Sequence, residues 1–179
     1  MKKTFWTLGI ILMIIGGIYL YNFAAIIQPV ANKISDDTRN EGIVIDVHYK
    51  YYVQPNILVF NLKNIPVDKA AADIFRCFLQ TSLTLKNNKF EKIELQYKGI
   101  TKFILNGDYF GQLGSEFGEQ NPVFTMRTFP ENLYSTTGES AYSKWEGGVL
   151  GVFSKQMEDF NDFNKKWYLD DMMSEMQKQ

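Results

Sequence analysis

The chain has 179 residues, of which 45% are hydrophobic and 22% charged, and its formal net charge is −1 at pH 7. Beyond an apolar N-terminal segment, this length leaves enough chain for one domain with a core of its own. All acidic residues lie beyond that segment, in a part of the chain that is slightly acidic, and this argues against nucleic acid as a partner, which needs a basic face.

An uncharged run over residues 5–29 follows two lysines at the N-terminus. A helix needs about 20 apolar residues to cross a bilayer, and the run has that length. The alternative is a cleavable signal peptide, which has a shorter apolar stretch and small residues before its cut. Candidate cut sites after Ala24 and Ala25 lack a small residue at the outer position. We therefore predict that residues 1–29 form a retained membrane anchor.

The orientation of this anchor follows from the basic residues at its two ends, because lysine and arginine collect on the cytoplasmic side. Lys2 and Lys3 precede the apolar run, whereas Lys33 and Arg39 follow it. The difference in number is small, but a short tail is held in the cytoplasm more easily than a whole domain. We expect a single-pass protein of the cell membrane with a cytoplasmic N-terminus and an extracytoplasmic (periplasmic) domain.

Residues 30–42 are polar and predict a linker, which leaves residues 43–179 for the domain. Apolar and polar side chains alternate from Ile43 to Val53, which indicates a strand. Residues 54–56 predict a turn, and residues 57–63 predict a second strand that forms a hairpin with the first.

The remaining elements follow from caps, alternation and helical spacing. Asp68 is expected to cap a helix that ends near Leu85. Alternation then predicts two strands that meet at Gly99. The expected ranges are strands over 90–98 and 100–106, a helix over 109–118, a strand over 123–129, a loop over 130–148 and an amphipathic helix over 149–173.

This order of elements predicts an α+β fold, with a mainly antiparallel sheet and helices on one face. From the second strand onward the order is strand, helix, strand, strand, helix, strand, which is that of the ferredoxin-like fold. A leading strand and a long C-terminal helix would be additions to it. Other antiparallel sheets with helices on one face fit nearly as well.

Residues that commonly carry catalysis or bind metals are scarce. His48 is the only histidine and is expected on the polar face of the first strand, and Cys77 is the only cysteine. A metal site of these residue types needs more of both. The sequence also has no Walker loop, nucleophile elbow or dinucleotide-binding glycine pattern. We therefore expect no metal site, no cofactor and no catalytic residue.

A first group of candidate binding residues lies in the helix predicted over 109–118. Glycines recur there and just before it at steps of four, three and four residues, which places them on one helix face. Gly111 and Gly114 would let another backbone approach that face closely. The alternative is a loop of consecutive turns in which this spacing has no meaning.

A second group is the segment Trp145, Glu146, Gly147 and Gly148. An aromatic side chain in a glycine-hinged loop can anchor a protein interface. The alternative is that Trp145 closes one end of the core.

Three functions are consistent with these observations. The anchor, an aromatic content of 15% and the scarcity of catalytic groups favour an interaction or assembly module that binds another protein of the cell envelope. A second hypothesis is a domain that binds a small hydrophobic ligand or a lipid between the sheet and the last helix, near Phe153, Met157 and Phe160. A third is an extracytoplasmic enzyme with an unconventional site of acidic residues and tyrosine.

Overall fold

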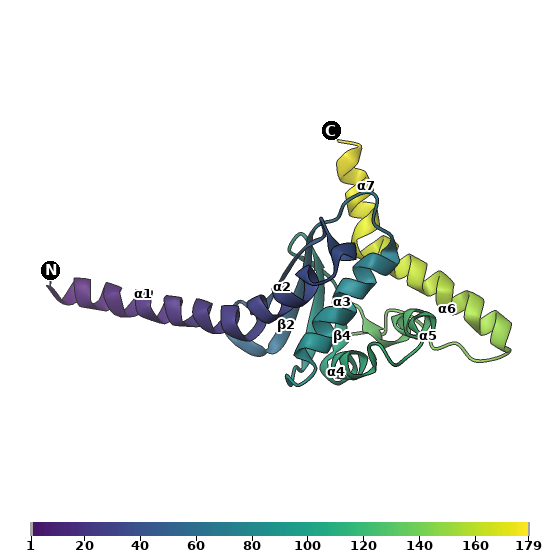
Figure 1. Ribbon diagram of the computed structural model, residues 1–179, viewed down its shortest axis with the longest axis horizontal. Coiled ribbons are helices and arrows are strands. Elements are labelled where there is room, and N and C mark those ends of the chain that lie inside the picture. The colour runs from purple at the N-terminus through teal and green to yellow at the C-terminus, as the bar shows by residue number, and fades with distance from the viewer. Residues whose placement is uncertain (1, 179) are drawn as a thin grey trace.

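The computed structural model describes residues 2–178 and contains a five-stranded sheet in a domain from which a long N-terminal helix projects (Figure 1). Helices cover one face of the sheet, and the N-terminal helix extends away from it. The elements are α1 (Lys2–Asn22), a π-helical turn (Phe23–Ile27), α2 (Gln28–Ser35), β1 (Val44–Lys50), β2 (Gln54–Asn64), α3 (Ala71–Leu85), β3 (Lys92–Tyr97), β4 (Ile100–Asn106), α4 (Gly107–Glu116), α5 (Pro122–Thr128), β5 (Leu133–Tyr134), α6 (Val149–Asn164), a second π-helical turn (Lys165–Leu169) and α7 (Asp170–Met176).

The N-terminal helix has two parts with different surroundings. Its first part, α1, protrudes from the domain with its apolar side chains exposed, and the helix is long and apolar enough to cross a membrane. This agrees with the predicted anchor. The helix then continues without a break through the π-helical turn into α2.

The linker predicted over residues 30–42 is corrected by the structure, because α2 packs into the domain. Ile26, Val30 and Ile34 recur at intervals of four residues on one helix face, and all three are buried in the core. The helix runs without a break across the boundary expected after residue 29. Ile26, near the end of the apolar run, belongs to the core of the domain.

The sheet has the order β1-β2-β3-β4-β5, in which only β2 and β3 are parallel. The predicted α+β fold with a mainly antiparallel sheet is confirmed. The ferredoxin-like order is not found, because that fold inserts a strand between the two strands that flank the first helix. Here those two strands, β2 and β3, pair directly, with Phe60 opposite Leu95.

Two local predictions differ from the structure for identifiable reasons. Residues 123–129, expected as a strand, lie in α5 up to Thr128. The Asn121 side chain accepts a hydrogen bond from the N–H of Val123, and Pro122 occupies the first turn. The sheet instead gains β5 from the segment expected to be a loop. The hairpin turn also falls at residues 51–53 rather than at 54–56.

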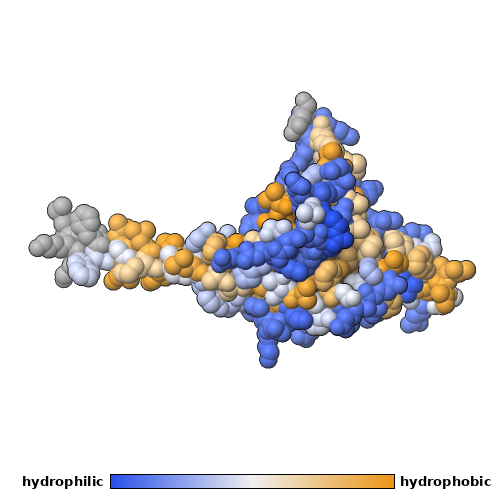
Figure 2. Space-filling view, in the orientation of Figure 1, coloured by the Kyte–Doolittle hydropathy of each residue, from blue (hydrophilic) through white to orange (hydrophobic). Residues whose placement is uncertain are grey.

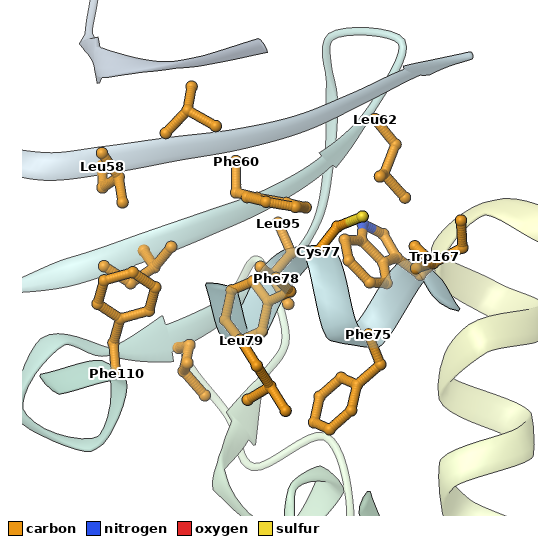
Figure 3. Packing of buried hydrophobic residues seen from close by; sticks show 14 of the residues in the cluster. Leu58, Phe60, Leu62, Phe75, Cys77, Phe78, Leu79, Leu95, Phe110 and Trp167 are labelled. Carbon is orange, nitrogen blue, oxygen red and sulfur yellow. The ribbon is translucent and has the colours of Figure 1, made fainter. Parts of the chain in front are cut away.

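Aromatic side chains dominate the core between the sheet and the helices (Figure 3). The ring of Phe60 on β2 meets Phe78 of α3 edge-on, with 5.2 Å between centroids, and lies 5.9 Å from the ring of Trp167. Trp167 is fully buried and its indole N–H donates to the carbonyl of Gln96. One β2 side chain therefore joins α3 and the C-terminal helical segment to the same face of the sheet.

Candidate functional site

Trp145 lies on the surface of α6 and does not close the core. Its indole N–H donates to a carboxylate oxygen of Asp159 at 2.6 Å, and Lys155 lies 6.0 Å from its ring. The side chain is exposed, and it is not part of the core cluster. The ring is therefore held in a fixed position with part of its surface open to another molecule.

The glycines that follow Trp145 shape the start of α6. Gly147 has a φ of +132°, which an L side chain rarely adopts, and Gly148 is the N-cap of the helix. Glu146 is exposed beside them. These residues direct α6 away from the sheet, so that its first turn projects from the domain.

The projecting end of α6 exposes large apolar side chains. Leu150 is 87% exposed and Val149 is 79% exposed, which is unusual for such residues at two successive positions of an ordered helix. Figure 2 shows this apolar tip at the end of the molecule opposite α1. We call the apolar tip together with the facing part of α5 the α5–α6 surface. Its residues are Val123, Phe124, Arg127, Val149, Leu150 and Phe153.

Arg127 lies at the centre of the α5–α6 surface and joins its two helices. Its guanidinium carbon is 5.5 Å from the ring centroid of Phe124 on α5 and 5.4 Å from that of Phe153 on α6. Its Nε is buried and has no hydrogen-bond partner among residues 2–178. Within the same residues no carboxylate pairs with this guanidinium. The surface thus combines exposed apolar area with an unpaired cation.

The two candidate glycines of α4 lie at its contact with α3. A Cβ at Gly114 would come within 2.3 Å of the carbonyl oxygen of Ser82, whereas a Cβ at Gly111 would make an ordinary contact of 3.5 Å with the carbonyl of Lys86. The close approach expected at these glycines therefore exists at Gly114 but not at Gly111, and the neighbouring backbone belongs to the same domain. Gly114 is buried by this contact and is not accessible to a partner.

The side chains of Cys77 and Tyr142 are hydrogen-bonded to other residues of the domain. Cys77 is buried, and burial raises the pKa of its thiol to about 12, which keeps it protonated at neutral pH. The Tyr142 hydroxyl donates to Asp162 at 2.9 Å, and burial together with this carboxylate raises the tyrosine pKa far above its usual range. His48 stacks on Tyr52 at 4.4 Å on the sheet face away from the helices, in line with its predicted position on a polar strand face.

Grooves that could hold a small ligand lie elsewhere than expected. The space between the sheet and the last helix is filled by buried side chains such as Phe160 and Trp167. A groove of about 360 Å³ lies instead among α3, α4 and α5, with Leu79, Leu113 and Met126 in its wall. Another of about 510 Å³ separates α2 from β1.

No protein-family model matches the chain, and no curated protein or solved structure matches it either.

Proposed function

We propose that the chain is a membrane-anchored interaction module of the cell envelope, without catalytic activity, that binds a partner protein through the α5–α6 surface. The observation that carries this proposal is the unpaired Arg127 between Phe124 and Phe153, at the centre of exposed apolar side chains. Exposed apolar patches of this kind mark interaction sites, and arginine and aromatic residues are enriched at the centres of interfaces.

The chemistry of the partner follows from the same residues. The Arg127 guanidinium has no carboxylate partner among residues 2–178, so an acceptor on the partner protein can bind its terminal N–H groups. A carboxylate is the best acceptor, because a charge-assisted hydrogen bond is about twice as strong as a neutral one. We therefore expect the partner to present an acidic side chain surrounded by apolar ones, which cover Leu150 and Val149.

We further propose that α1 is retained as a single-pass anchor of the cell membrane, with a cytoplasmic N-terminus and a periplasmic domain. Retention is supported by Asn22, because a cut after Ala24 or Ala25 would remove a buried side chain that bonds to β1 and its turn. A C-terminal reporter that is active only outside the cytoplasm tests the orientation. An inactive reporter on a stable chain would overturn it.

Site-specific crosslinking in intact membranes tests the interaction surface. A photo-crosslinking residue at Leu150 should capture one discrete envelope protein, and Arg127→Glu should abolish that adduct while Arg127→Lys retains part of it. The matched control is Val67, which is 78% exposed in the β2–α3 loop but lies outside the surface. Absence of a discrete adduct at Leu150, or the same adducts at both positions, would refute the proposal.

Binding of a small hydrophobic ligand is the second candidate function, supported by the groove of about 360 Å³ among α3, α4 and α5. This volume lies within the usual range of about 300–1,000 Å³ for ligand sites. Extraction of the purified chain under denaturing conditions, followed by mass spectrometry, should then release a stoichiometric small molecule. An extract without one argues against this function.

A further inference from the structure

The length of α1 sets the level of the bilayer on the molecule. Its uncharged part begins after Lys2 and Lys3, and residues 5–24 span about 30 Å at 1.5 Å per residue, which is the thickness of the hydrocarbon. If α1 spans the membrane, Asn22 lies close to where the hydrocarbon ends. The first element of the domain that reaches this level is the turn between β1 and β2, beside the junction of α1 and α2 (Figure 1).

Asn22 fixes the turn at this level. Its Nδ2 donates to the carbonyl of Tyr52 at 2.7 Å, and its Oδ1 accepts from the N–H of Tyr49 at 3.1 Å. The rings of Tyr21 and Tyr49 stack at 5.7 Å in the same contact. The turn is therefore attached to the helix through three neighbouring contacts and cannot move away from the membrane by itself.

The tip of the turn reaches further toward the N-terminus along α1. A groove of about 440 Å³ has Ile14 and Ile18 of α1 in one wall and Val53 in the other. Ile18 and Ile14 lie about 6 and 12 Å from Asn22 along the helix axis, at 1.5 Å per residue. The tip thus faces a stretch of α1 that a spanning helix places at membrane depth.

The residues of this turn are unsuited to a turn in water. Tyr51 and Tyr52 have φ values of +52° and +63°, and the N–H of Val53 donates to the carbonyl of Lys50 at 3.3 Å. Positive φ at both central residues is the geometry of a type I′ turn, which strongly favours asparagine and glycine. Here two tyrosines occupy those positions, and Tyr51 is 70% exposed. Strain kept at an exposed aromatic tip indicates a function for the exposed rings.

We propose that the β1–β2 turn inserts into the bilayer interface beside α1 and forms a second membrane contact of the domain. Tyrosine is enriched at this layer, because its ring is apolar and its hydroxyl reaches polar headgroups. Tyr51 and Val53 contribute the apolar contact, and the hydroxyl of Tyr51 remains at headgroup level. The contact depends on the anchor role of α1 but not on the α5–α6 surface.

Depth measurement in lipid vesicles tests this contact with the full chain. Tyr51→Cys and Val67→Cys variants are labelled with a nitroxide and reconstituted in phosphatidylcholine vesicles, and the accessibility of each label to oxygen and to a water-soluble nickel chelate is measured. Val67 is a matched control, since it is 78% exposed but follows the far end of the 11-residue strand β2, about 36 Å from the turn at 3.3 Å per residue. The parent chain is treated with the same nitroxide reagent as a control. Its single cysteine, Cys77, is buried and should not be labelled.

The label at position 51 should have an oxygen-to-nickel accessibility ratio several-fold above that at position 67. A third label at Leu12, in the exposed part of α1, separates the possible failures. Lipid accessibility at position 12 with water accessibility at position 51 overturns the second contact and leaves the anchor intact. Water accessibility at both positions overturns the anchor as well.

A turn variant tests whether the tyrosines make the contact. Tyr51→Asn combined with Tyr52→Gly supplies the residues that a type I′ turn prefers, so the domain should melt at the same or a higher temperature. A nitroxide at Val53→Cys should nevertheless change from lipid to water accessibility in this variant. A label that keeps its lipid accessibility without the tyrosines would overturn their role.

Discussion

Asn22 is the residue whose replacement tests most directly how the anchor and the domain are joined. It lies in an otherwise apolar helix, is fully buried, and bonds to the carbonyl of Tyr52 and the N–H of Tyr49. Asn22→Leu has a similar size and suits a membrane helix better, but it removes both of these hydrogen bonds. We expect the variant to insert normally and to have a less stable domain.

The magnitude follows from the two backbone groups that lose their partner. A buried polar group left unsatisfied costs about 1–3 kcal/mol, so the two together cost about 2–4 kcal/mol if the turn relaxes in part. In a chain of this size, 1 kcal/mol lowers the melting temperature by about 2–4 °C, which predicts a decrease of about 4–16 °C.

Thermal unfolding of the full chain in detergent micelles measures this decrease, followed by tryptophan fluorescence because Trp167 is fully buried in the domain core. Asn161→Leu is the matched control: this asparagine also lies within a helix but is exposed, so its replacement should change stability by less than about 0.5 kcal/mol. Equal melting temperatures for Asn22→Leu and the parent chain would refute the reasoning that this contact joins helix and hairpin.

Three further predictions concern the domain itself. Gly114→Ala places a Cβ against the backbone of α3 and should destabilise the chain by about 1–3 kcal/mol in thermal unfolding, whereas Gly111→Ala, which has room, should stabilise it by about 0.5–1 kcal/mol. Cys77 should react with a thiol reagent at pH 8 only after denaturant is added, because burial raises its pKa to about 12; rapid reaction of the folded chain would contradict this. Hydrogen bonds and the charge of Arg39 hold the pKa of Asp37 well below its ordinary 3.8. The ionised carboxylate therefore contributes fully to stability above pH 3.8, and this contribution is lost as the pH falls toward the pKa of Asp37 in the folded state. Asp37→Asn should therefore lose less stability than the parent chain on acidification below about pH 4, as measured by melting temperature.

The sequence predicts those elements whose pattern has a single physical cause. Alternation from Ile43 onward identifies β1, because one side of that strand packs on the core and the other carries polar groups. The apolar run identifies a membrane-length helix but not its boundary. Ile26, Val30 and Ile34 are apolar because they enter a protein core, and a lipid environment would select the same residue types.

The errors arise where local signals compete. Val123 and Phe124 favour a strand by residue type, but Asn121 and Pro122 form a helix start that outweighs this preference. Trp145, the binding residue predicted from the sequence, lies beside α6 but is not part of the α5–α6 surface. Arg127 could not be singled out from the sequence, because its contact with Phe153 joins two helices that are not adjacent in the chain.

The continuous helix from α1 into α2 has a consequence for the order of folding. The core lacks three of its members until the residues that follow the anchor have packed, so the domain is complete only when the helix is in place. A soluble fragment that begins at residue 43 would uncover the part of the core that α2 seals. Loss of this helix and loss of core packing are thereby the same event, and a cut between α2 and β1 that released the helix would expose an unfinished core to proteolysis.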